Sequence, residues 1–577
     1  MRSKRRLLAG LALMGVGGAA YVAYVRRRPL LARLLRLPPV QVGVTREENI
    51  RVPLADGLTL ATDLYRPQAS GRHPTVLIRT PYGRANLLTH FTAQRLAERG
   101  YNVVCQDVRG RFDSDGEFEP YVHEAADGQT TIEWIVQQPW SDGQVAMWGQ
   151  SYVGYVQWAA AAAATASPTP HLKALVPTIT MAHLGYDGQR PLTLDRTLRW
   201  LLLLDAMENA ELSALERLGR TLRADVQDRA IAPGWSHLPL ATADEAVFGK
   251  PIPLYRTWVA HNQPDSAYWT AVDHRPKVKD ITIPVHLVAG WYDIFLDGQL
   301  ADYTALREAG REPYLTIGPW THIESGGRWE SLRVAIDWFD AHLKGRRQRL
   351  PAKPVRLYVM GAGEWRDYDA WPVPASLTPY YLQAQARLSP DLPPADSPSE
   401  HYRYDPADPT PNVGGPLLSS RAGPKDNRQL EARADVLTYT TLPLAQAVEV
   451  IGPVKLALFA RSSREYTDFF GRLCDVYPDG RSINVCDGLF RVEPGRGERQ
   501  ADGSLYLEVD MTATAYRFRQ GHSIRLQVSS GAHPRYARNL GTGEPALTGT
   551  AMVAAEQTIY HDEVRPSALL LPIAAKG

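Results

Sequence analysis

A serine lies on a sharp turn between a predicted strand and a predicted helix. The apolar segment 145–148 leads through Ser151 and Gly154 into the alanine-rich segment 156–161. A strand that turns tightly into a helix exposes a serine hydroxyl for nucleophilic attack. The usual spacing of this turn is G-x-S-x-G, whereas here Val153 takes the second glycine position and the glycine follows it. We predict that Ser151 is a nucleophile; the alternative is a chance run of small residues before a helix.

A serine nucleophile needs a general base, and the base needs a carboxylate that orients it. In hydrolases with such a turn, the chain order is serine, then an acidic residue, then histidine, and each partner follows a strand end. Asp293 follows the apolar segment 285–290, and His322 follows the next predicted strand at 314–317. The rival carboxylate, Asp297, lies a further turn from the strand end. We therefore predict that Asp293 and His322 complete a catalytic triad with the serine.

Two donors would stabilise the oxyanion of the tetrahedral intermediate. The backbone N–H of Tyr152 is the natural first donor because it follows the nucleophile. The loop 79–84 lacks the glycine run that often supplies a second donor, and the phenol of Tyr82 could reach instead. From the residues alone, a tyrosine that serves only the turn is the more frequent case.

The elements that must position these residues alternate between strands and helices. Such alternation predicts a largely parallel sheet covered by helices on both faces, here one α/β domain over residues 46–350. The expected strands are 75–78, 103–106, 172–176, 285–288 and 314–317, and the expected helices are 93–99, 126–137 and 332–343.

Two other regions depart from this alternation. Residues 184–279 favour helices inserted above the strand ends as a cap. Residues 351–577 contain many short alternating segments with turn signals, which is typical of a β-sandwich or jelly roll. In the inserted region, packed helices are predicted by the segment 198–204 and by Leu212, Leu215, Leu218 and Leu222.

The N-terminal segment, residues 1–45, combines basic residues with an apolar stretch. Residues 7–25 carry no charge and have basic residues on both flanks. This length just spans a bilayer as a helix, and the basic triplet at 26–28 opposes export. We predict a single uncleaved membrane anchor and thus a membrane contact, with a cleaved signal peptide and export as the alternative. The basic residues on both flanks leave the orientation open.

Composition excludes some other classes. The 64 Lys and Arg nearly balance the 62 Asp and Glu, so no nucleic-acid partner is expected. The predicted triad needs no metal and no organic cofactor. Cys105 lies in an apolar segment and reads as a small buried side chain, while Cys474 and Cys486 flank a turn and could pair across two strands. Two reduced thiols are the alternative, and the oligomeric state is left open.

Several segments resemble those of one known family, the serine hydrolases of the X-prolyl dipeptidyl peptidase type, and within it the cocaine-esterase-like group. The resemblance covers the chain from about residue 47 to its end and implies an α/β-hydrolase fold with an inserted helical cap, followed by an all-β jelly-roll domain. It also assigns Ser151, Asp293 and His322 as the triad, and Tyr82 with the Tyr152 amide as the oxyanion hole. The segments are 52–57, 81–82, 106–110, 149–154, 290–293, 318–322 and 475–481.

The resemblance also narrows the substrate. Family members that hydrolyse α-amino-acid esters carry acidic residues just after the triad aspartate, which attract the substrate ammonium, whereas here the apolar residues 294–296 follow. An uncharged acyl group is therefore favoured, and the resemblance places Phe295 and Trp200 in the substrate pocket. From the residues alone, Trp200 is a packing residue first.

We predict a carboxylic-ester hydrolase that acts on a small-molecule ester. Prolyl peptidase members similarly use an amine anchor and a large N-terminal domain, and only about 45 residues precede the hydrolase segment here. An aminopeptidase or acylase that cleaves amides with the same triad is the alternative. A non-catalytic protein that binds carbohydrate or another partner is the alternative of a different class.

Overall fold

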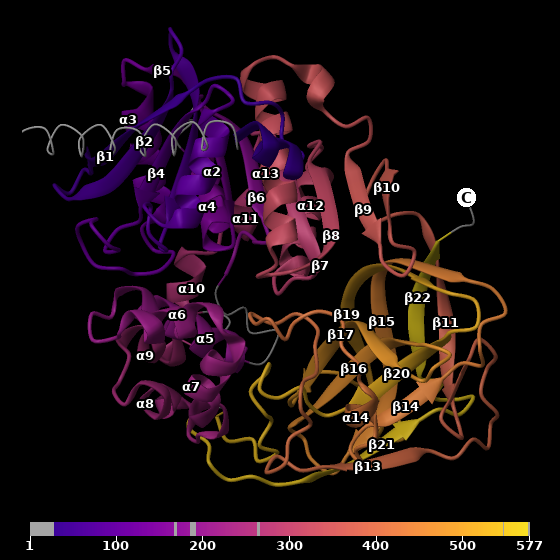
Figure 1. Cartoon of the computed structure of the whole chain (residues 1–577). Helices are drawn as coiled ribbons and strands as arrows, with labels where there is room; N and C mark the ends of the chain where they lie inside the picture. The colour runs from indigo at the N-terminus through magenta and orange to yellow at the C-terminus, as the bar shows by residue number, and fades with distance from the viewer. Residues whose placement is uncertain (1–27, 167–169, 185–191, 262–265, 546, 575–577) are drawn as a thin grey trace, which may run out of the picture.

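The computed structural model of the chain describes residues 28–166, 170–184, 192–261, 266–545 and 547–574. Figure 1 shows an α/β domain, a group of helices beside one edge of its sheet, and an all-β domain formed by the C-terminal part of the chain. This is the predicted α/β-hydrolase arrangement followed by an all-β domain.

A ten-stranded sheet forms the centre of the α/β domain, in the order β1-β2-β4-β3-β5-β6-β7-β8-β9-β10. Neighbouring strands from β4 to β9 pair in parallel, and the two ends of the sheet pair antiparallel. The carboxyl ends of the parallel strands therefore meet at one edge, where ligands bind in open α/β sheets. The bounds are β1 (Val44–Pro53), β2 (Thr59–Pro67), β3 (His73–Thr80), β4 (Asn102–Asp107), β5 (Ser141–Gln150), β6 (Leu172–Thr178), β7 (His286–Tyr292), β8 (Tyr314–Thr321), β9 (Val355–Val359) and β10 (Glu364–Tyr368).

Helices cover both faces of this sheet. Ile78 and Cys105 belong to the apolar cluster that contains α2 and α13, whereas their chain neighbours Leu77 and Val104 belong to the cluster that contains α3, α4 and α12. Because both faces are covered, central strands such as β4 and β7 are buried along their whole length. The bounds are α2 (Leu87–Ala97), α3 (Glu124–Val136), α4 (Tyr152–Ala166), α12 (Leu296–Glu308) and α13 (Ser325–Leu343).

The cap lies between β6 and β7. Leu198 and Leu202 of α5 pack against Ile231 of α7 in an apolar cluster of their own. Its elements are α5 (Leu194–Glu208), α6 (Ala214–Leu222), α7 (Ala224–Ser236), η1 (Leu240–Thr242), α8 (Ala243–Phe248), α9 (Pro253–Ala260), α10 (Ala267–Ala271) and α11 (Arg275–Val278).

The predicted packing of the cap leucines is wrong for three of them. Leu215, Leu218 and Leu222 of α6 are 81%, 54% and 73% exposed. Helix α6 contacts α5 through polar groups instead: Arg217 donates to the backbone carbonyl of Asn209, and Arg220 pairs with an aspartate of α5. The leucine spacing correctly indicates a helix with one apolar face, but periodicity does not say which face is covered.

The predicted membrane anchor falls on residues 7–25, which lie outside the described residues. In the described part of the chain, no helix combines the length and the apolar character that crossing a bilayer requires. This finding contradicts the predicted membrane anchor, membrane partner and membrane location, and they are not retained. The charge-free stretch meets the minimum length for a membrane span, but length alone does not establish one.

The C-terminal domain is a network of twelve strands, and its contacts reach both the sheet and the cap. The hydroxyl of Tyr292, at the end of β7, donates to the backbone carbonyl of Asn484. The Ala241 N–H of the cap donates to the backbone carbonyl of Leu547. The strands are β11 (Ala375–Gln383), β12 (Arg387–Ser389), β13 (Glu400–Tyr404), β14 (Leu437–Thr440), β15 (Val448–Ser462), β16 (Thr467–Val476), β17 (Ser482–Val492), β18 (Glu498–Arg499), β19 (Leu505–Phe518), β20 (Ser523–Ser529), β21 (Ala555–Tyr560) and β22 (Ala568–Ala574), with one short helix, α14 (Arg428–Glu431).

Two details differ from the expected organisation. The segment 355–360, expected among the strands of the all-β domain, supplies β9 to the α/β sheet, where it pairs in parallel with β8. Cys474 and Cys486 are both free and buried, as is Cys105. An irregularity between Leu473 and Cys474 places Cys486 opposite Leu473, so the two thiols are not directly paired across the strands.

Asp302 of α12 provides a stability prediction. Its carboxylate accepts the Ala182 N–H at 2.8 Å, and burial raises the pKa of Asp302 to about 8. Because the folded-state pKa lies above the unfolded value, the neutral carboxyl group contributes to stability. This contribution is fully present below about pH 4 and is lost as the pH rises toward 8. Asp302→Asn stays neutral and retains an acceptor for Ala182. We expect its free energy of unfolding to exceed that of the wild type by an amount that grows between pH 5 and pH 9, to the order of a few kcal/mol.

Urea unfolding of the wild type and Asp302→Asn at pH 5 and pH 9 measures this difference in the free energy of unfolding. A difference that does not change with pH would contradict the assigned titration of Asp302.

Candidate active site

Ser151 occupies the turn between β5 and α4 in a conformation that is rare for its residue type. Its φ is 57°, in the left-handed region that side chains other than glycine seldom adopt. The turn is held by the Ser151 N–H, which donates to the backbone carbonyl of Thr178 at 3.0 Å, and by the Ser151 carbonyl, which accepts the Gly154 and Tyr155 N–H groups at 2.8 and 2.9 Å. Backbone strain maintained by surrounding contacts is common at functional sites.

The displaced glycine of this turn has a steric cause. A Cβ atom at Gly154 would lie 2.4 Å from Cγ2 of Thr180, and one at Gly149 would lie 2.1 Å from Cγ1 of Val153. Valine at the usual glycine position is therefore tolerated because it fills the space beside Gly149. The second glycine is required one position later, where the chain after β6 approaches α4.

This crowding predicts that Gly154→Ala destabilises the fold by about 1–3 kcal/mol, the usual result of overpacking. Thr180→Ala removes the methyl group that clashes. Because Thr180 Oγ1 has no hydrogen-bond partner among the described groups, Thr180→Ala alone should have a small effect, and the double variant should regain part of the loss. Melting temperatures of the four proteins test this; a Gly154→Ala protein as stable as the wild type would contradict it.

The structure brings the three predicted triad residues together. His322 Nε2 lies 3.0 Å from Ser151 Oγ, and His322 Nδ1 lies 2.7 Å from Asp293 Oδ2. The other oxygen of Asp293 accepts the Phe295 N–H at 2.8 Å, which fixes the carboxylate. Asp293 is 3% exposed. This linear chain of contacts can move a proton from the serine to the imidazole and hold the resulting imidazolium. The rival, Asp297, lies in the first turn of α12 and makes no contact of this kind with His322.

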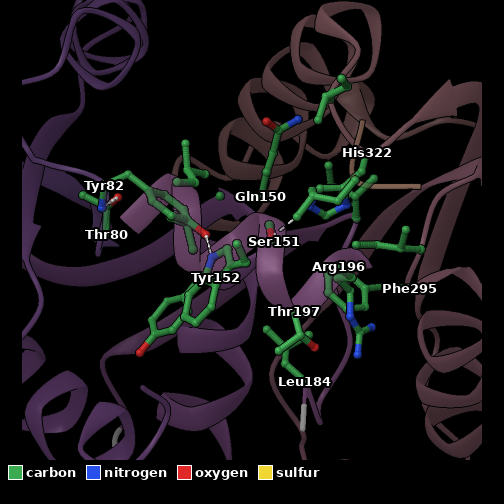
Figure 2. A pocket seen from close by; sticks show the side chains of 18 of the residues that line it. Thr80, Tyr82, Gln150, Ser151, Tyr152, Leu184, Arg196, Thr197, Phe295 and His322 are labelled. Atoms are coloured by element: carbon green, nitrogen blue, oxygen red, sulfur yellow. Dashed lines mark hydrogen bonds between the residues drawn. The ribbon is translucent and has the colours of Figure 1, made fainter. Parts of the chain in front are cut away.

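Tyr82 lies beside the serine. Figure 2 shows Tyr82 and His322 on opposite sides of Ser151. The Tyr82 hydroxyl accepts a hydrogen bond from the indole Nε1 of Trp200 at 3.1 Å, and burial raises the pKa of Tyr82. The phenol therefore remains protonated at neutral pH, and its hydroxyl, which also interacts with the Ser151 side chain, has a proton to donate at the serine.

Tyr152 contributes a backbone group, while its side chain anchors the turn. It is the first residue of α4, so its N–H has no acceptor within the helix. Its hydroxyl donates to Glu124 at 2.7 Å and accepts the Tyr121 N–H at 2.9 Å, which ties the start of α4 to α3. Glu124 in turn pairs with the buried Arg79. The buried network holds the amide of Tyr152 beside the serine.

The serine opens into a cavity of about 470 Å³ lined by all three parts of the fold. Trp200 and Phe295, the two predicted pocket residues, both line it, and their contact with substrate stays a prediction. The Trp200 ring stacks on Trp258 of the cap with centroids 5.5 Å apart. Leu418 and Leu547 of the all-β domain close one side. The cavity is thus mainly aromatic and aliphatic, which suits an apolar ligand with a few polar contacts.

The charged side chains among the described lining residues of this cavity are positive. Among the described lining residues there is no aspartate and no glutamate, while Arg196 and Arg328 both contribute. Arg196 lies over the ring of Phe295 at 5.5 Å. Sequence reasoning identified neither arginine nor the hydrogen bond between Trp200 and Tyr82. The only signal in the sequence for Arg328 is its position, six residues after His322 at the start of the helix that follows β8.

The sequence matches two family models along most of its length. Residues 56–324 match the X-Pro dipeptidyl-peptidase (S15 family), and residues 350–570 match the X-Pro dipeptidyl-peptidase C-terminal non-catalytic domain. Among curated proteins, a cocaine esterase from Rhodococcus sp. (strain MB1 Bresler) is 35% identical over 91% of this chain and 98% of its own length.

Two solved structures share the fold. An aminopeptidase from a marine sediment archaeon, Thaumarchaeota archaeon, is 24% identical and has a TM-score of 0.78 over 93% of this chain and 98% of its own. An α-amino acid ester hydrolase is 24% identical and has a TM-score of 0.74 over 92% of this chain and 97% of its own.

The predicted family is confirmed, and the alternative of a non-catalytic binding protein is not retained. The chain is a serine hydrolase and belongs to the X-Pro dipeptidyl-peptidase (S15) family.

Proposed function

We propose that this enzyme hydrolyses carboxylic esters of small molecules through an acyl-serine intermediate on Ser151. Its base would be His322, oriented by Asp293, and its oxyanion donors would be the Tyr82 hydroxyl and the Tyr152 N–H. The contacts of 3.0 Å and 2.7 Å that link these side chains support the roles of the first three.

In the acylation step, the Ser151 hydroxyl oxygen forms a bond to the ester carbonyl carbon while His322 Nε2 takes the hydroxyl proton. The carbonyl oxygen becomes an oxyanion, which Tyr82 and Tyr152 stabilise by donating to it. When the intermediate collapses, the bond to the alcohol oxygen breaks, and the imidazolium returns the proton to the leaving alkoxide. The Asp293 carboxylate stabilises the imidazolium in between.

In the deacylation step, water attacks the acyl carbon and gives its proton to His322. The bond between the acyl carbon and Ser151 Oγ then breaks, and the imidazolium returns the proton to Oγ. A carboxylic acid is released, and the resting enzyme is restored. No external oxidant, reductant or second substrate besides water is needed.

The lack of acidic residues among the described lining residues supports a preference for esters over substrates with a free amine. An aminopeptidase needs an anionic group to bind the substrate ammonium, and none of the described lining residues is acidic. The identity to a protein named a cocaine esterase favours the same preference. Esters are also the less demanding substrates, since an alkoxide leaves more readily than an amide nitrogen.

A substrate panel tests the proposal. Residues 46–577 are assayed with p-nitrophenyl acetate, butyrate and benzoate, and with Gly-Pro-p-nitroanilide. We expect turnover of the esters and little or none of the amide. Asp297→Asn is a matched control for Asp293→Asn, because only Asp293 bonds to the imidazole. Hydrolysis of the amide alone would replace this proposal by a peptidase activity.

A further inference from the structure

Arg328, near the start of α13, lines the cavity that contains the serine turn. Ser331, three residues later, accepts a hydrogen bond from the indole of Trp148 on β5 at 2.9 Å. Residues three apart share one face of a helix, so Arg328 lies on the face of α13 that is directed at β5. It lines the same cavity as Ser151 and Val153.

The Arg328 guanidinium lacks a counter-ion among the described side chains. Across the described parts of the chain, no carboxylate lies within ion-pair distance of it and no hydrogen bond satisfies it. Burial lowers the pKa of Arg328 to about 10, with no neighbouring carboxylate to oppose the shift. The group remains a cation at neutral pH all the same.

Arg328 is partly buried, and fully buried arginines of this protein are paired. Arg79 lies 2.7 Å from Glu124, Arg199 lies 2.7 Å from Asp195, and Arg472 lies 3.0 Å from Asp487. Withdrawing a charge from water is costly unless a partner of opposite charge compensates it. Arg328 is the case in which the compensating anion is missing from the described side chains, and it faces the substrate cavity. A ligand can supply that anion.

We propose that Arg328 binds a carboxylate of the substrate, so that the enzyme acts on half-esters of short dicarboxylic acids; this inference rests on the proposed ester hydrolysis. The ester carbonyl would lie at Ser151 while the free carboxylate pairs with the guanidinium, whose planar donors match a carboxylate in a bidentate manner. Hydrolysis releases the dicarboxylate and the alcohol.

The test compares half-esters with neutral esters of equal length. The kcat/KM values of the mono-p-nitrophenyl esters of succinate, glutarate and adipate are divided by those of the p-nitrophenyl esters of butyrate, valerate and hexanoate. We expect at least one ratio above 1 in the wild type. Arg328→Gln should lower that ratio roughly 10- to 100-fold, as expected for the loss of a charged hydrogen-bonded pair. The chain length with the highest ratio measures the reach from Ser151 to Arg328.

Arg333→Gln is the matched control. It removes a cation from the same helix, but Arg333 pairs with Glu330 and does not line the cavity, so the ratio should stay at the wild-type value. Arg328→Lys keeps the charge without the planar fork and should give an intermediate ratio. Ratios below 1 for all three lengths in the wild type, or a ratio that Arg328→Gln leaves unchanged, would overturn the inference.

A binding measurement separates this inference from the proposed function. Calorimetric titration of glutarate into wild type and Arg328→Gln reports on the anion site without any turnover. Failure of ester hydrolysis with Arg328-dependent glutarate binding would reject the proposed function alone. Hydrolysis of neutral esters, with glutarate bound equally by both proteins or by neither, would reject the anion site alone.

Discussion

Replacing Ser151 by alanine is expected to lower kcat for p-nitrophenyl butyrate by roughly 10,000-fold or more. The substitution removes only Oγ, the atom 3.0 Å from His322 Nε2, and leaves the cavity and the oxyanion donors in place. Residual turnover would come from binding and from the oxyanion hole. Single-turnover assays with excess enzyme measure the loss.

The three triad residues are expected to act together in catalysis, and this provides a control for the Ser151→Ala prediction. Residues that act as one unit lose function together, so His322→Ala should be nearly as inactive as Ser151→Ala, and the double variant should lose little more. Circular dichroism and melting temperature check that the variants fold. A Ser151→Ala enzyme that keeps a tenth of the activity would show that another group attacks the ester.

Tyr82→Phe is expected to lower kcat by roughly 100- to 1,000-fold with a smaller change in KM, the usual result of removing one oxyanion donor. The ring and its packing remain, and only the hydroxyl that accepts the Trp200 N–H is lost. The loss should fall on kcat because the oxyanion exists only after attack, whereas the ground-state ester is neutral.

Trp200→Phe tests whether the indole orients the Tyr82 hydroxyl. It keeps an aromatic ring in the cavity and removes the donor at 3.1 Å, so kcat should fall, but by less than in Tyr82→Phe. In the Tyr82→Phe background the same substitution should have little further effect on kcat, since its partner is already absent. Additive losses would mean that Trp200 acts through substrate packing instead.

The positions of the serine, aspartate and histidine could be predicted because their signals are local. Each follows an apolar segment that reads as a buried strand, and parallel strands bring their carboxyl ends to one edge of a sheet. The distance from the strand end then separates Asp293, which directly follows the strand, from Asp297, which lies a further turn away. The structure places the three side chains in contact, which no single segment encodes.

Tyr82 and the displaced glycine show where local signals end. A tyrosine after a strand most often reads as a turn residue, and the family resemblance is what favours the oxyanion role of Tyr82 over that reading. Its hydroxyl accepts a hydrogen bond from Trp200 of the cap, a residue more than a hundred positions later in the chain. Likewise, Gly154 is required by the approach of Thr180 from the chain after β6, a contact that the spacing of the motif does not contain.

The exposure of the cap leucines and the position of Arg328 in the cavity could not be predicted from sequence patterns for a related reason. Periodicity reports that a helix has an apolar face, but burial is decided by what packs on it, and α6 turns polar groups to α5 instead. An arginine in a sequence reads as a surface residue. Only the packed structure reveals that the Arg328 cation faces the cavity without a carboxylate partner among the described side chains.

Covalent labelling with diethyl p-nitrophenyl phosphate tests the central claim most directly. Attack by the serine forms a bond from Ser151 Oγ to phosphorus, expels p-nitrophenolate and leaves a diethylphosphoryl group that lacks an efficient route to hydrolysis. Mass spectrometry should find one such group per chain, on the peptide that contains Ser151, together with complete loss of ester turnover, and none on the Ser151→Ala protein. A label on another residue, or an unlabelled Ser151 peptide while turnover is lost, would contradict the acyl-serine mechanism.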